Sequence, residues 1–343
     1  MSDRSAVVAM SGGKDSSAAV LVLQRQGYEV SAVTMALGLD DEQERIGKLK
    51  RLCEVLKVPL QVVEFSGVFE RFVRFPFASA YLSDRTPNPC SQCNREIKFG
   101  RFMREALRIS GAKVYATGHY ASVRTLDGRL LLCEPYEQRK SQIYFLATIE
   151  PGCLTNVLFP LAEKSLDEVR DLTRDLPLVN RKESQNACFL EGRKLTEYLE
   201  SELAPDAVAS GDIVDTKGTV IGKHEGLVHY TVGQRRGVGF AGGRRLYVIA
   251  KDGRSNRLVL GEKEDLLSRG FRVIFPVYWR PLAQGEIVEV KIRYQTPALL
   301  AKVVKAGHEG FSLELPKPAM SVTPGQIAVL YQDHSVVAAG EIA

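Results

Sequence analysis

The stretch AVVAMSGGKDSS (residues 6–17) decides the fold of the N-terminal region. Residues 6–10 form an apolar run typical of a buried strand, and residues 16–26 have the spacing of a helix. Between them, Gly12 and Gly13 can adopt positive φ and leave room for phosphate oxygens. The N-terminus of the following helix would direct its free N–H groups at the same anion. The sequence therefore predicts a phosphate-binding loop, although it lacks the G-x-x-x-x-G-K-[ST] pattern of Walker A.

The rest of the N-terminal half alternates short strands and helices, which indicates a mostly parallel sheet covered on both faces. After about residue 194 strands and glycine turns dominate, and the end of the chain is typical of a small barrel. We predict an α/β domain followed by a β-rich central domain and a C-terminal β-barrel, at residues 1–194, 195–264 and 265–343. Further strands are expected at 30–35, 60–63 and 113–117, and helices at 42–57 and 99–109.

The composition is that of an ordinary globular protein: 343 residues, 45% hydrophobic and 25% charged. No apolar run approaches the ~20 residues of a membrane span, and the N-terminus lacks the layout of a signal peptide. We therefore expect a cytoplasmic protein with reduced thiols and no membrane association.

The net charge of +5, from 46 Lys+Arg against 41 Asp+Glu, is a modest excess that solubility alone explains. Its distribution is more informative, because residues 233–245 place arginines between glycines. Guanidinium groups on such a backbone match phosphate oxygens, which predicts an acidic partner such as a nucleic acid. The arginines concerned are Arg235, Arg236, Arg244 and Arg245.

Two cysteine motifs point to chemistry. Cys90 and Cys93 form C-x-x-C within TPNPCSQCNREIKF (residues 86–99), where the prolines predict a rigid, non-helical loop. If Asn94 caps the following helix, Cys93 lies near a helix N-terminus, which would lower its thiol pKa. A second C-x-x-C is missing, so a closed four-cysteine zinc site is not expected. Cys188 stands alone and by itself is typical of a small buried residue.

The loop at residues 11–16 resembles the PP-loop of ATP pyrophosphatases, which cleave ATP between the α and β phosphates and adenylate an oxygen. Taken with the cysteine motifs, the whole chain resembles the tRNA-specific 2-thiouridylase family. The strings that carry the resemblance are SGGKDSS (11–17), TPNPCSQCNREIKFG (86–100), ATGHYA (116–121), KSQIYFL (140–146), ACFLEG (187–192), HYTVGQRRGVG (229–239), KIRYQTP (291–297) and VTPGQIAVLY (322–331).

The resemblance implies that ATP adenylates the C2 oxygen of the wobble uridine of tRNA, and that a persulfide on Cys188 then delivers sulfur. Cys93 would release the sulfur or close a disulfide with Cys188, and a sulfur-donor or sulfur-relay protein would load the enzyme. His119 follows a strand end and should face the site, either to transfer a proton or to orient a neighbour. The residues matched to ATP and Mg²⁺ are Ala9, Met10, Ser11, Gly12, Gly13, Lys14, Asp15, Ser16, Met35 and Gly118.

The family's RNA contacts also have counterparts in this sequence. The target base must leave its stack to be reached, and a loop of asparagine and proline suits that. The matched positions are Asn88, Pro89, Cys90, Lys140, Ser141, Gln142, Arg293, Tyr294 and Gln326. Lys14 and Ser141 depart from the residues that many members carry, valine and aspartate respectively.

Three alternatives stay open at this stage. Cys90, Cys93 and Cys188 together could ligate a [4Fe–4S] cluster with one open iron, which would replace the persulfide route. The chain could be a different PP-loop enzyme that transfers sulfur to another tRNA position or to a small substrate. It could also be a non-catalytic RNA-binding paralogue.

Overall fold

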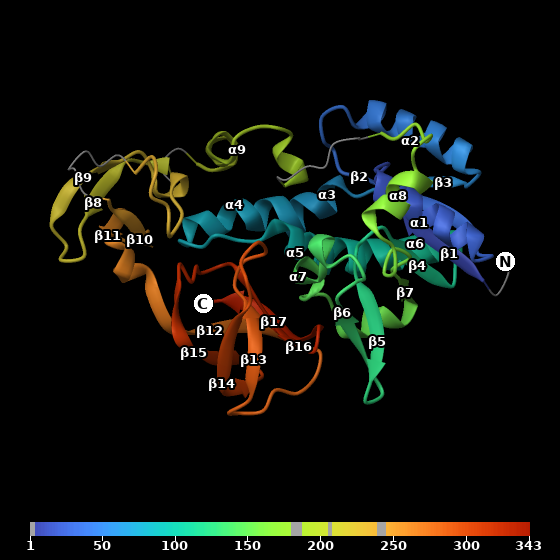
Figure 1. Ribbon diagram of the computed structural model, residues 1–343. Helices are drawn as coiled ribbons and strands as arrows, with labels where there is room; N and C mark the ends of the chain where they lie inside the picture. The colour runs from blue at the N-terminus through green and yellow to red at the C-terminus, as the bar shows by residue number, and fades with distance from the viewer. Residues whose placement is uncertain (1–3, 180–186, 205–207, 239–244) are drawn as a thin grey trace.

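The computed structural model describes residues 4–179, 187–204, 208–238 and 245–343, which form three β-sheets with flanking helices (Figure 1). The first is a five-stranded parallel sheet in the order β3-β2-β1-β4-β7. Its strands are β1 (Ser5–Ala9), β2 (Glu29–Ala36), β3 (Leu60–Glu64), β4 (Val114–Thr117) and β7 (Val157–Leu158).

Helices cover both faces of this sheet, as the sequence predicts. Ala6 and Val8 of β1 pack with α1 (Lys14–Arg25) and α2 (Glu42–Leu56), whereas Val7 belongs to a core shared with α6 (Phe102–Ser110). Successive side chains of a strand point to opposite faces, so a central strand buried on both must be apolar throughout. This is why residues 6–10 form a continuous hydrophobic run instead of alternating with polar residues.

The strand order reverses at β1, because β2 lies on one side of it and β4 on the other. The loops that leave the carboxyl ends of β1 and β4 therefore diverge, and in open α/β sheets this divergence opens a ligand crevice. The loop after β1 contains Ser11–Gly13, and the loop after β4 contains Gly118 and His119.

A long helical run extends from this domain over the barrel toward the central sheet (Figure 1). It consists of α3 (Ser66–Phe69), the π-helical segment η1 (Glu70–Arg74) and α4 (Phe75–Leu82). A second run begins with α5 (Pro89–Cys93), continues as the π-helical segment η2 (Asn94–Arg101) and ends in α6. Short helices α7 (Ile143–Leu146), α8 (Leu166–Leu172) and α9 (Leu195–Glu202) complete the helical part.

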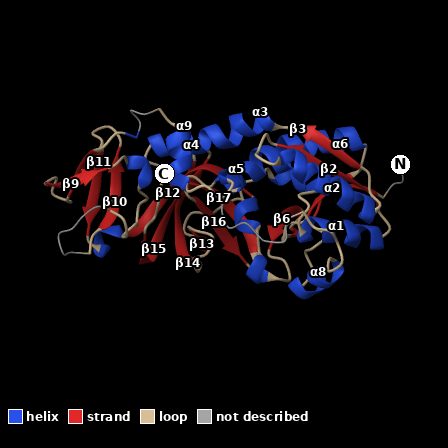
Figure 2. Ribbon diagram, turned by 90° about the horizontal axis from the view of Figure 1, so that it is seen from above, coloured by secondary structure: helices blue, strands red, loops and turns tan. Residues whose placement is uncertain are grey.

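The remaining sheets lie beside the first domain (Figure 2). The central sheet has the order β10-β11-β8-β9, built from β8 (Gly211–Val214), β9 (Val220–His224), β10 (Tyr247–Asp252) and β11 (Arg257–Gly261). The last six strands close into a barrel through the pairing of β12 with β17. They are β12 (Leu267–Tyr278), β13 (Ile287–Lys291), β14 (Leu299–Gly307), β15 (Gly310–Met320), β16 (Ile327–Gln332) and β17 (Ser335–Ile342).

One connection crosses the predicted division of the chain. The hairpin of β5 (Ser122–Leu126) and β6 (Arg129–Cys133) extends the barrel sheet, because Cys133 pairs with Ser335 of β17. The α/β, central and barrel architecture is thus confirmed, while the boundaries near residues 194 and 264 stay a prediction. Within the described part of the chain, the search for helices of sufficient length and apolarity to span a bilayer finds none.

Candidate functional site

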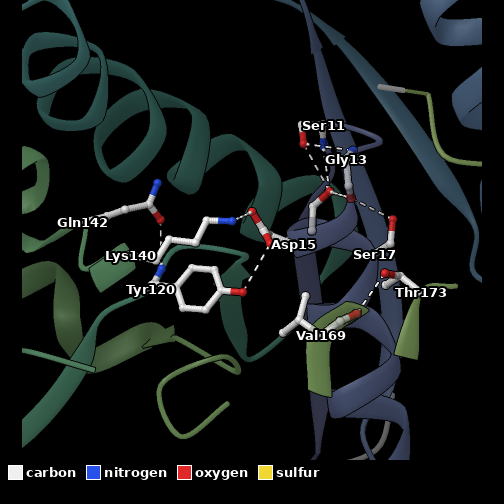
Figure 3. Close-up of polar contacts among 10 residues, drawn as sticks. Ser11, Gly13, Asp15, Ser17, Tyr120, Lys140, Gln142, Val169 and Thr173 are labelled. Carbon is white, nitrogen blue, oxygen red and sulfur yellow. Dashed lines mark hydrogen bonds and ion pairs between the residues drawn. The ribbon is translucent and has the colours of Figure 1, made fainter. Parts of the chain in front are cut away.

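Hydrogen bonds from its own serines fix the conformation of the loop after β1 (Figure 3). Ser16 and Ser17 donate from Oγ to the carbonyl oxygen of Gly13, at 3.1 and 2.9 Å, and Ser11 Oγ accepts from the Gly13 N–H at 3.3 Å. Gly12 has a φ of +82°, as expected, but Gly13 is extended with a φ of −82°. Gly13 is the N-cap of α1 and contributes no side chain to it, so the first N–H groups of the helix are open to an anion.

Asp15, in the first turn of α1, is engaged by two residues from the segment after β4 (Figure 3). Its Oδ2 lies 3.0 Å from Nζ of Lys140, and its Oδ1 accepts from the Tyr120 hydroxyl at 3.3 Å. Gln142 holds Tyr120 in place by a reciprocal pair of hydrogen bonds of 2.9 Å each. Lys140 and Gln142 were predicted to bind RNA, and the structure brings both to the phosphate loop.

Gly118 permits the close approach of the β4 loop to α1. A Cβ at this position would lie 2.5 Å from the carbonyl carbon of Asp15 and 2.6 Å from the nitrogen of Ser16. His119 follows and lies at the crevice, with Nδ1 2.9 Å from Thr117 Oγ1 and its ring 5.5 Å from that of Phe99. Burial, with a smaller contribution from the charge of Lys98, lowers the pKa of His119 well below its ordinary value. His119 is therefore a neutral hydrogen-bonding group at physiological pH and a weak base.

These loops enclose an open pocket with a volume of about 390 Å³. Seven of the ten residues predicted to bind the nucleotide line it, and Cys188 and His119 line it as well. Among the described residues, Gly12, Gly13 and Lys14 lie in the loop and first turn beside the pocket and are not part of its lining. The full lining is Ala9, Met10, Ser11, Asp15, Ser16, Val33, Thr34, Met35, Leu37, Leu39, Arg45, Lys98, Phe102, Thr117, Gly118, His119, Gln142 and Cys188.

The Pro-Asn-Pro segment differs from its prediction. Pro89 begins α5, and Asn88 is its N-cap, with Oδ1 accepting from the Ser91 N–H at 3.1 Å. Asn94 is instead buried inside the helical run and donates to the carbonyl oxygen of Phe145. Proline is well suited to the first helical position and asparagine to the N-cap, which is why the helix begins earlier than expected.

This shift changes the chemistry expected of Cys93. Cys93 ends α5 and continues into η2, so it does not lie at a helix N-terminus. Burial raises its pKa to about 11, an effect that Lys98 opposes and that Cys188 and Cys90 increase slightly. The expectation of a lowered pKa for Cys93 is therefore wrong.

Cys188 lines the same pocket as the phosphate loop. It is an exposed free thiol at the start of a short 3-10 turn, and the next residue, Phe189, is buried among aromatic rings. Desolvation raises the pKa of Cys188, and Lys98 lowers it. All six cysteines are free, and Asn186, directly before this motif, lies outside the described residues.

The fit of a [4Fe–4S] cluster can be tested on these thiols. Cys90 and Cys188 are exposed, Cys93 is half-buried, and mutual electrostatic effects link the three. Over the parts of the chain that the structure describes, however, no three Cys, His, Asp or Glu side chains are arranged to hold a metal ion. The described arrangement does not fit a cluster.

The residues predicted to bind RNA lie in separate parts of the structure. Gln326 donates to the carbonyl oxygen of Thr86 at 2.7 Å, which fastens the barrel to the loop that precedes Asn88. Asn88 and Pro89 line a concavity of about 450 Å³ between α4 and the barrel. Cys90 is exposed one residue further on.

A further concavity, of about 350 Å³, joins Ser141 to Tyr294 of the barrel. Tyr294 packs on Phe145 with ring centroids 4.5 Å apart, and the neighbouring Arg293 donates to Thr323 Oγ1 at 2.8 Å. The segment 140–142 thus runs from this concavity, at Ser141, to the nucleotide pocket, at Gln142. Of the four clustered arginines, Arg235, Arg236 and Arg245 are exposed, and Arg244 lies outside the described residues.

Sequence reasoning missed two cations of the nucleotide pocket, Arg45 and Lys98. Arg45 donates to the Met35 carbonyl oxygen at 2.7 Å and pairs with Glu42, so its position is fixed. Lys98 lies in the motif at residues 86–99, five residues after Cys93. Residues five apart are neighbours in a π-helix but not in an α-helix, so only the expectation of a π-helix would have placed Lys98 beside Cys93.

The parallel sheet, its switch point and the open serine–glycine loop define a nucleotide-binding α/β enzyme domain of the PP-loop class. Three family descriptions match the chain: "tRNA methyl transferase HUP domain" over residues 4–192, "tRNA methyl transferase PRC-barrel domain" over 196–262, and "Aminomethyltransferase beta-barrel domain" over 268–342.

Curated relatives match over almost their whole length. The tRNA-specific 2-thiouridylase MnmA 1 of Syntrophus aciditrophicus is 36% identical, covering 98% of this chain and 92% of its own. The tRNA-specific 2-thiouridylase MnmA of Moorella thermoacetica is 38% identical, with 98% of each chain covered, and that of Desulforudis audaxviator is 37% identical, covering 98% and 97%. The chain belongs to the tRNA-specific 2-thiouridylase family.

Proposed function

We propose that this protein catalyses the ATP-dependent 2-thiolation of the wobble uridine of tRNA. The observation that carries the proposal is that Cys188 lines the same pocket as Ser11, Asp15 and Ser16 of the phosphate loop. A thiol beside a nucleotide site fits a reaction in which an oxygen is first activated and then replaced by sulfur. The names of the curated relatives support tRNA as the substrate.

In the first step, ATP would bind with its phosphates at the N-terminus of α1 and the serines of the loop. Asp15 would help to hold Mg²⁺, which would neutralise charge on the phosphates. The C2 oxygen of uridine would attack the α-phosphorus, the bond between the α and β phosphates would break, and pyrophosphate would leave. Adenylation converts the C2 oxygen, a poor leaving group, into part of AMP, which leaves readily. His119, as a neutral imidazole, would donate or accept a hydrogen bond at the reacting base.

In the second step, the terminal sulfur of a persulfide on Cys188 would attack C2. The C2–S bond would form, the C2–O bond would break, and AMP would depart with the electron pair. The Cys93 thiol would then attack Sγ of Cys188, which forms the Cys93–Cys188 disulfide and breaks the bond between Sγ and the transferred sulfur. The thiol proton would pass to the released 2-thiouridine. A dithiol reductant would restore both thiols, and a sulfur-donor protein would supply the next persulfide sulfur to Cys188.

tRNA would approach along the surface that joins the two domains. The Asn88–Pro89 concavity and Gln326 lie where the barrel meets the first domain, and Ser141 and Tyr294 line the neighbouring concavity. A flipped base entering between them could reach the nucleotide pocket past Gln142, whose side chain lines it. The exposed arginines of residues 233–245 would contact the phosphate backbone of tRNA.

A sulfur-transfer assay on unmodified tRNA, with Cys90→Ala, Cys93→Ala and Cys188→Ala beside the wild type, tests the route. The persulfide mechanism predicts loss of thiolation for Cys93→Ala and Cys188→Ala and tolerance of Cys90→Ala. Loss for all three, together with iron in protein prepared without oxygen, would refute the persulfide route. Thiolation that survives Cys188→Ala would refute the role given to that residue.

A further inference from the structure

Lys98 occupies an unusual position in the nucleotide pocket. It lines the pocket together with Cys188, His119 and the phosphate-loop residues Ser11 and Ser16. Unlike Arg45 and Lys140, which are paired, Lys98 forms neither a hydrogen bond nor an ion pair with any residue that the structure describes. A half-buried ammonium group with no anionic partner in the described part of the chain is suited to an anion that enters the pocket.

The π-helical conformation of η2 places Lys98 on the side of Cys93. In an α-helix, residues three and four apart are neighbours and residues five apart are not. The i→i+5 hydrogen bonding of a π-helix instead brings residues five apart together, and such segments occur frequently at functional sites. Gly100 permits this winding, because a Cβ there would lie 2.7 Å from the carbonyl oxygen of Arg95, five residues earlier.

Lys98 and Cys188 are each fixed by the residue that follows. Phe99 is buried, with ring centroids 6.1 Å from Tyr115 and 5.5 Å from His119. Phe189 is buried against Phe77 and Tyr198, at 5.1 Å from each. The buried rings of Phe99 and Phe189 therefore constrain the backbone next to Lys98 and Cys188, and both of these side chains line one pocket.

The charge of Lys98 acts on every thiol of the site. It lowers the pKa of Cys90, Cys93 and Cys188, against the desolvation that raises all three. The other groups that act on Cys188 are Cys90 and the backbone at residues 188 and 189. Among the described groups that influence Cys188, Lys98 is thus the positive charge, and it also helps to keep His119 neutral.

We propose that Lys98 is a further catalytic residue, which stabilises anionic sulfur on Cys188 and guides it into the nucleotide pocket. The inference rests on the proposed function and adds a role within it. As C2–S forms and C2–O breaks, negative charge passes from sulfur to the departing AMP. Lys98 lines the pocket that contains both Cys188 and the phosphate loop, so its ammonium group would stabilise the negative charge first on sulfur and then on AMP. It would do so without giving up a proton.

The test is the pH profile of Cys188 alkylation by iodoacetamide, followed by mass spectrometry of the peptide that contains Cys188. In Lys98→Met the midpoint should rise by about one pH unit, because a nearby positive charge is lost. Lys98→Arg keeps the charge and should keep the midpoint. Arg104→Met removes an exposed cation of α6 from the same helical run and should also leave it unchanged.

An unchanged midpoint in Lys98→Met, in protein whose thermal unfolding matches the wild type, would overturn the proposal. Lys98→Gln provides a second neutral variant if the methionine variant is unstable. Loss of tRNA-dependent AMP formation with an unchanged midpoint would overturn it too, because the lysine would then serve the phosphates of ATP. The alkylation assay needs neither ATP nor tRNA, so a shifted midpoint in a protein that never thiolates tRNA would contradict only the proposed function.

Discussion

Lys140 Nζ lies 3.0 Å from Asp15 Oδ2, although the two residues are 125 positions apart in the sequence. The pair connects the segment expected to meet tRNA with the residue expected to hold Mg²⁺. Lys140 and Mg²⁺ would compete for the same carboxylate, so binding of MgATP would free Lys140 for a phosphate of the tRNA.

The first prediction follows from this competition. Lys140→Met should lower the Mg²⁺ concentration that half-saturates AMP formation, by about threefold to tenfold, and should raise the KM for tRNA. Lys164→Met, which removes a surface ion pair with Glu168 of similar length (2.9 Å), should change neither quantity. A higher or equal Mg²⁺ requirement in Lys140→Met would show that the pair does not oppose the metal.

The second prediction concerns the close approach of Gly118 to α1. The added Cβ of Gly118→Ala would collide with the backbone of Asp15 and Ser16, so the phosphate loop must move. We expect ATP affinity to fall at least about tenfold, and the free energy of unfolding to fall by about 1–3 kcal/mol. Calorimetric titration with ATP and chemical denaturation measure the two effects.

A matched control for Gly118 lies in α2. Gly47 is inside this helix, and a Cβ there meets no atom within 4 Å. Gly47→Ala should therefore stabilise the protein by about 0.5–1 kcal/mol and leave ATP binding unchanged. Equal ATP affinities for Gly118→Ala and the wild type would show that the approach of the β4 loop is not needed.

The third prediction is a pH dependence caused by His119. Its pKa in the folded protein is lowered, so below about pH 6.5 the unfolded chain takes up a proton that the folded protein refuses. Stability should therefore be lost as the pH falls, by up to about 1.4 kcal/mol per pH unit. Urea unfolding at several pH values should give a shallower slope for His119→Gln and an unchanged slope for His308→Gln, a substitution at an exposed turn. The same slope in all three proteins would mean that His119 titrates normally.

The fourth prediction separates two roles of Asn88. As the N-cap of α5 it satisfies the Ser91 N–H, so Asn88→Ala should cost about 1 kcal/mol of stability. Asn88→Ser can cap as well and should restore stability. If Asn88 also contacts the target base, thiolation should remain impaired in Asn88→Ser, measured as kcat/KM for tRNA. Wild-type kcat/KM for tRNA in Asn88→Ser would show that Asn88 caps the helix and does not contact the target base.

Local patterns were enough to predict the framework of the first domain. The helix expected at residues 42–57 is observed as Glu42–Leu56, and the strand expected at 30–35 as Glu29–Ala36. Both have a clear hydrophobic period and a clear end. At the helix that begins at Pro89, both Asn88 and Asn94 are candidate caps, and the local signal that favours Asn88 is the proline that follows it at the first helical position.

The relations that give the site its chemistry could not be predicted in this way. The contact between Lys140 and Asp15 depends on the β4 loop returning to α1, and that between Gln326 and Thr86 depends on how the barrel docks. The pKa of Cys93 is set by burial in the assembled core, which outweighs the charge of Lys98. Lys98 escaped notice because a π-helical turn, and not an α-helical one, relates it to Cys93.

The central claim is that ATP activates a tRNA uridine and that Cys188 supplies the sulfur. The most direct measurement is a single turnover of persulfide-loaded protein with ATP and unmodified tRNA, in which pyrophosphate, AMP and 2-thiouridine are quantified together. We predict equal amounts of all three with the wild type, and pyrophosphate without 2-thiouridine with Cys188→Ser. Formation of 2-thiouridine without ATP, or by Cys188→Ser, would contradict the account.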